Sequence, residues 1–181
     1  MWVTDGAYQT WADFLERWGA GEPGDPVTLP RLAPEDFAGD SWERLINRIG
    51  DAVNRRLLAW AETLARELPA ARDEFAAARA LNHARWALAP IRALAGAPGL
   101  PDDVRARLLA MVDGQVASVQ QQLDEQVRRL RRTGTPPAAV EARLRTIREN
   151  SLTAVTRGTH ATNAGWSADP TARPRRRVIP D

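Results

Sequence analysis

Apolar residues recur every three or four positions through most of the chain, and nowhere do they alternate strictly with polar ones. A period near 3.6 places such residues on one face of a helix, whereas a half-buried strand needs alternation. The longest run lies between Asp40 and Pro69, and its apolar members are Trp42, Leu45, Ile46, Ile49, Val53, Leu57, Trp60, Leu64 and Leu68. We therefore expect an all-α fold.

Three long helices are expected, at about 41–68, 70–95 and 101–133. The second is rich in alanine, with its larger apolar residues at Phe75, Leu81, Leu88 and Ile91. Acidic residues open the third helix and arginines close it, which suits the dipole at both ends. The connections between the long helices are short, which favours antiparallel neighbours in a bundle. Short helices are expected before and after this bundle.

Composition divides the chain into three segments. Residues 1–40 hold a short aromatic helix, at about 10–19 with Thr10 as its cap, and a connector rich in proline and glycine. Residues 41–150 hold the bundle. Residues 151–181 show no periodicity and are dominated by small, polar and basic residues, so we expect a disordered basic tail.

Enzymatic motifs are missing from the sequence. It contains no cysteine and two histidines, which excludes disulfides, thiolate metal sites and a three-histidine metal site. It also lacks a phosphate loop, a GxGxxG fingerprint, a GxSxG elbow and an HExxH helix. The sequence therefore predicts a non-enzymatic protein without a metal or cofactor.

The amino terminus shows neither a basic segment nor an apolar core of a signal peptide, and no apolar run approaches the ~18 residues of a membrane span. We therefore expect a cytoplasmic protein that does not enter a membrane. All 25 basic side chains are arginine and none is lysine. This bias is typical of a GC-rich genome, and we expect a bacterial source.

Two apolar faces predict a protein partner or a homo-oligomer. Heptad spacing in the third long helix resembles a coiled-coil seam, and the short first helix carries large aromatic residues on one face. A tryptophan in the tail could anchor the chain in a partner's pocket. The predicted partner-binding residues are Trp11, Phe14, Trp18, Leu109, Val116, Leu123, Leu130 and Trp166. This hypothesis of an interaction or assembly subunit requires more apolar surface than one copy can bury.

Two alternatives remain open. The first is a helical subunit that contacts the nucleic-acid backbone through arginine clusters, formed by Arg128, Arg129, Arg131, Arg132, Arg173, Arg175, Arg176 and Arg177. The second is an anion-binding sensor or enzyme built on Arg79, His83 and Trp86, which share one helix face. The competing interpretation of this trio is a histidine packed between helices, with Trp86 in the core.

Overall fold

The computed structural model describes residues 4–153 of the 181-residue chain. Within this range the α-helices are α1 (Thr4–Gly19), α2 (Ser41–Ala70), α3 (Glu74–Ala95), α4 (Asp102–Arg132) and α5 (Pro137–Glu149), with short 3-10 helices η1 (Pro26–Thr28) and η2 (Pro34–Asp36) between α1 and α2. The same range contains no strand, which confirms the all-α class. The predicted disordered tail was placed too early, because residues 151–153 are described and Leu152 is fully buried. The rest of that tail, with Trp166, Arg173, Arg175, Arg176 and Arg177, lies outside the described residues.

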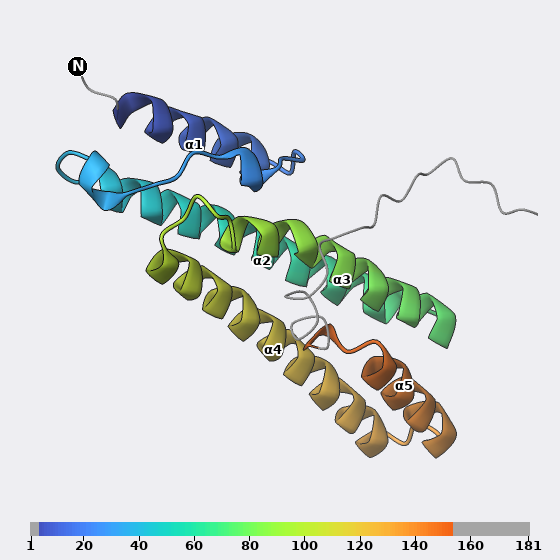
Figure 1. Ribbon diagram of the computed structural model, residues 1–181. Coiled ribbons are helices and arrows are strands. Elements are labelled where there is room, and N and C mark those ends of the chain that lie inside the picture. Colours follow the sequence, from blue (N-terminus) through green and yellow to red (C-terminus); the bar gives the residue numbers. More distant parts are fainter. Residues whose placement is uncertain (1–3, 154–181) are drawn as a thin grey trace, which may run out of the picture.

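Helices α2 and α3 form the central pair of the fold (Figure 1). A turn of three residues separates them, and α3 runs back along α2. Helix α1 lies along the first half of α2, α4 contacts both α2 and α3, and α5 packs against α4 and α3. None of the described helices has the length and apolar character that crossing a membrane requires.

Helix α1 is longer than the sequence predicts, because it begins at Thr4 rather than at residue 10. The predicted cap, Thr10, lies inside the helix, and its hydroxyl donates a hydrogen bond to the Gly6 carbonyl at 2.7 Å. Helix α3 begins later than predicted, because Asp73 accepts a hydrogen bond from the Ala76 N–H at 2.7 Å and caps the helix there. Both differences reflect local side-chain bonds that periodicity does not reveal.

The buried face of α4 departs from the predicted heptad seam. Val116 and Leu123 are buried as core residues, but Leu109 is half-buried and Leu130 is exposed. The residues that do face the core are Val104, Leu108, Val112, Val116, Val119, Leu123 and Val127. Five of the six spacings between these residues are four, and one is three. A straight helix drifts by ~20° per heptad from a strict seven-residue repeat, so the contact stripe leaves the predicted positions at both ends.

The connector between α1 and α2 is fastened to the turn between α3 and α4. Leu29 and Leu32 are buried in the same apolar cluster as α1 and the long helices. The Trp11 indole donates a hydrogen bond to the Pro30 carbonyl at 2.9 Å, and the Leu32 N–H donates to the Gly99 carbonyl at 2.7 Å. A Cβ atom on Gly99 would lie 2.8 Å from the Pro30 carbonyl oxygen, so only glycine allows this approach.

We predict that Gly99→Ala lowers the free energy of unfolding by about 1–3 kcal/mol, because the backbone of the connector must move away from the new methyl group. The matched control is Gly114→Ala in the middle of α4, where a Cβ atom meets nothing within 4 Å. That substitution should raise the free energy of unfolding by about 0.5–1 kcal/mol through helix propensity. Urea unfolding measures both, and equal effects at the two glycines would contradict the close approach.

Candidate functional site

The aromatic face of α1, predicted to bind a partner, is buried in the chain's own core. Trp11, Phe14 and Trp18 are all buried within the cluster that α1 shares with α2. Arg56 of α2 fixes the end of α1, because its guanidinium donates to the Trp18 carbonyl at 2.9 and 2.7 Å and lies 4.4 Å from the centre of the Trp18 ring. Burial lowers the pKa of Arg56 below its usual value. This face therefore has an intramolecular role.

Most of the predicted seam of α4 is likewise buried within the chain's own core. Val116 and Leu123 are fully or almost fully buried, and Leu109 packs against the core from a half-buried position. Leu130 alone among the four seam residues is exposed. A single copy thus covers most of the apolar surface on which the sequence-based hypothesis of assembly depended.

The largest exposed apolar side chains lie instead on α3. Phe75 is 77% exposed and Trp86 is 70% exposed. Both the expectation that Phe75 belongs to the core face and the interpretation that Trp86 anchors the core are therefore wrong. The buried face of α3 combines four alanines with four larger residues, namely Ala77, Ala80, Ala84 and Ala95 with Leu81, Leu88, Ile91 and Leu94. The spacing of these alanines is the signal in the sequence that could have identified this face, whereas our expectation followed the larger apolar residues.

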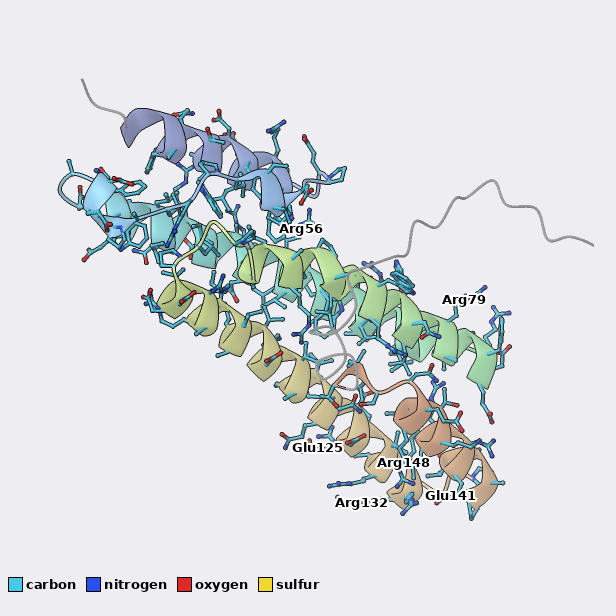
Figure 2. The ribbon with its side chains drawn as sticks, viewed as in Figure 1. Arg56, Arg79, Glu125, Arg132, Glu141 and Arg148 are labelled. Carbon is cyan, nitrogen blue, oxygen red and sulfur yellow. The ribbon has the colours of Figure 1, made fainter. Side chains whose placement is uncertain are left out.

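A shallow groove runs between α2 and α3 beside these exposed rings. Two adjoining cavities of about 530 and 250 Å³ make up the groove, and both are lined by Glu67 and His83. Most of the remaining wall is alanine, with Arg79 towards one end and Arg56 at the other; the alanines are Ala59, Ala70, Ala71, Ala76, Ala80, Ala84 and Ala87. Figure 2 shows Arg56 close to the end of α1 and Arg79 farther along the α2–α3 pair.

Arg79, His83 and Trp86 share one side of α3, as their spacing predicts. His83 is exposed, and its Nδ1 atom lies 3.2 Å from Oε2 of Glu67 across the groove. The Arg79 guanidinium lies 5.9 Å from the centre of the Phe75 ring. Helical geometry places Phe75, Arg79 and Trp86 along one edge of the groove, since they are four and seven residues apart. We call this edge the aromatic rim.

The arginines predicted to contact nucleic acid separate into different environments. Arg128 and Arg131 line a cavity between α4 and α5, whereas Arg129 and Arg132 do not. Arg131 also pairs with Glu141 of α5. Within residues 4–153 there is no cluster of three or more His, Cys, Asp or Glu side chains that could hold a metal ion.

Comparisons of the sequence with protein-family models and with curated proteins, and of the structure with solved structures, found no match. Only the geometry of the described residues therefore bears on function.

We predict that Trp86→Ala changes the free energy of unfolding by no more than ~0.5 kcal/mol, because the ring contributes little to the core. The matched variant is Trp60→Ala, since Trp60 is buried and its indole donates to the Ala84 carbonyl at 2.8 Å. That substitution should cost about 3–5 kcal/mol. Urea unfolding of both variants decides the point, and a loss above ~2 kcal/mol for Trp86→Ala would show that its ring is packed.

Proposed function

We propose that this chain is a non-enzymatic, cytoplasmic interaction subunit whose α2–α3 groove receives an amphipathic helix from a protein partner. The observation that carries the proposal is the aromatic rim, where two large rings of α3 stand in solvent just outside a groove whose wall is rich in alanine. Exposed apolar patches on the rim of a groove mark protein-interaction sites. In this proposal the three long helices act as an antiparallel bundle that holds the groove rigid.

The shape of the groove supports a helix as the occupant. On α2 the groove extends from Arg56 to the end of the helix near Ala70, a length of about 21 Å at 1.5 Å per residue. Arg56, at its beginning, also binds the carbonyl of Trp18 at the end of α1. Helix α1 therefore stops where the groove begins, and an added helix would continue the layer that α1 starts. Alanine walls allow such a helix to approach closely and bury its larger side chains.

Charge favours a partner helix that carries carboxylates. Arg79 lines the groove and makes no ion pair among the described residues. The one interaction that its guanidinium makes with them is the cation–π contact to the Phe75 ring. Glu67, the acidic residue in the wall, already faces His83. A carboxylate on the partner would therefore find an unpaired guanidinium at the edge of the groove, next to aromatic anchors of the kind that dominate binding energy.

The test uses displayed 16-residue helical peptides with randomised apolar and flanking positions, selected on the full chain. We expect enrichment of peptides with one apolar face and flanking glutamates. Calorimetric titration of the best peptide should show binding at least about tenfold weaker for Trp86→Ala, equivalent to ~1.4 kcal/mol. Leu58→Ala is the control, because Leu58 is an exposed apolar residue of α2 outside the groove walls.

Reversing the charge at position 79 tests whether the partner peptide binds through its carboxylates. Arg79→Glu should weaken the glutamate-flanked peptide and bind a lysine-flanked version of it better than the wild type does. Equal losses in Trp86→Ala and Leu58→Ala would rule out the rim as the docking surface. Sedimentation of the wild type provides a further check, since self-association that disappears in Trp86→Ala would make the occupant a second copy and contradict the proposal of a foreign helix.

A further inference from the structure

The cavity between α4 and α5 gathers positive charge from both helices. Its volume is about 440 Å³, and it is lined by Gln120, Asp124, Arg128, Arg131, Leu144, Arg148, Ser151 and Thr153. Three arginines and one acidic residue, Asp124, are thus among the residues that line it. Figure 2 shows Arg148 on α5, on the side that faces α4. The concave shape distinguishes this cluster from a basic patch on an open helix surface.

The chain holds the wall of this cavity in place. Gln120 of α4 accepts hydrogen bonds at its Oε1 atom from the Leu152 N–H at 3.0 Å and from the Ser151 hydroxyl at 3.4 Å. Leu152 is fully buried, so the segment after α5 is anchored between these polar contacts and the core. The ion pair between Arg131 and Glu141 joins the two helices on the other side. Helices α4 and α5, which carry Arg128, Arg131 and Arg148, are therefore held in place relative to each other.

Two of the three arginines lack an anionic partner. Among residues 4–153, Arg128 and Arg148 form no ion pair or hydrogen bond. Asp124 lies four residues before Arg128 on the same helix face, yet its carboxylate accepts from the Gln120 amide at 3.4 Å. Arg128 and Arg148 stand in the wall of one cavity without a paired carboxylate, and an anion placed between them would supply the missing counter-charge.

We propose that this cavity binds a compact phosphate-bearing anion. The planar guanidinium group donates paired hydrogen bonds to phosphate oxygens, and several arginines together favour a multiply charged phosphate over a halide or a carboxylate. A volume of this size accommodates a phosphate or diphosphate group with part of its ester. Inorganic phosphates and phosphate esters share this chemistry. The inference stands apart from the partner helix, because none of these residues lines the α2–α3 groove.

The test measures the melting temperature and the calorimetric binding of pyrophosphate and of phenyl phosphate, with the full chain at constant ionic strength. We expect a saturable rise in melting temperature for the wild type. Arg128→Gln and Arg148→Gln should each weaken binding at least about tenfold. Without ligand, these variants should melt at nearly the same temperature as the wild type, because neither side chain makes an ion pair or a hydrogen bond within residues 4–153. A purely structural role would instead lower their melting temperature.

The matched controls are Arg129→Gln and Arg132→Gln, which remove the same charge from the same helix outside the cavity. They should bind both phosphates as the wild type does. Equal weakening in all four variants would show general charge attraction and overturn the proposal, as would the absence of any saturable shift. The last measurement uses a DNA oligonucleotide as the ligand. If its binding depends equally on Arg128, Arg129 and Arg132, the arginines bind a nucleic-acid backbone and the proposal is overturned. A preference for phenyl phosphate over pyrophosphate distinguishes an ester from a free anion within the proposed site.

Discussion

The close packing of α2 against the alanine face of α3 decides where the other large side chains of this protein can go. The Trp60 indole crosses this interface and donates a buried hydrogen bond to the Ala84 carbonyl, which requires the two backbones to lie near each other. Ala84 is itself buried at this contact and has a side chain small enough to allow it. Phe75 and Trp86 lie away from the buried face of α3 and are left outside. The groove and the aromatic rim are consequences of the same packing.

The helical class was predictable from the sequence because it depends on a period that needs no knowledge of neighbours. The long helices follow this period closely, and Leu45, Ile49 and Leu57 are buried as the spacing predicts. The assignment of faces was harder. Phe75 seemed a better core residue than alanine on hydrophobicity alone, but the distance between two packed helices sets the size of the side chain that fits. That distance follows from the tertiary structure and cannot be obtained from one helix at a time.

The apolar face of α1 shows a related limit of sequence reasoning. Trp11 and Trp18 were correctly placed on one face, yet their spacing does not tell whether that face meets the same chain or another. The answer depends on the connector, whose Leu32 and Pro30 meet the α3–α4 turn at Gly99. A glycine in a turn looks ordinary in the sequence, and its close contact with residues far along the chain appears only in the structure.

The arginines illustrate how the fold sorts residues that the sequence groups together. Arg128 and Arg131 are three residues apart, so they lie on the same side of α4 and both line the cavity. Arg129 and Arg132 each follow one residue later, and neither lines the cavity. Burial of Val140 and Ile147 sets the rotation of α5, and this rotation brings Arg148 to the cavity. The same rotation directs Arg143 to the Leu68 carbonyl and Arg145 towards Glu74. A run of basic residues is therefore divided into some that stabilise the fold and some whose charge is left unpaired.

Exposure of the aromatic rim is costly for a protein selected for stability alone. Burying a large apolar side chain contributes about 1.5–3 kcal/mol, which Phe75 and Trp86 largely forgo while alanines occupy the core positions of the same helix. Natural proteins tolerate such local departures mainly where a site requires them. The two exposed rings and the unpaired Arg79 lie along one edge of the groove, and the unpaired Arg128 and Arg148 lie in one cavity. Two exposed rings with an unpaired arginine next to the groove, and two unpaired arginines in the wall of one cavity, are the departures from stability that support the two binding proposals.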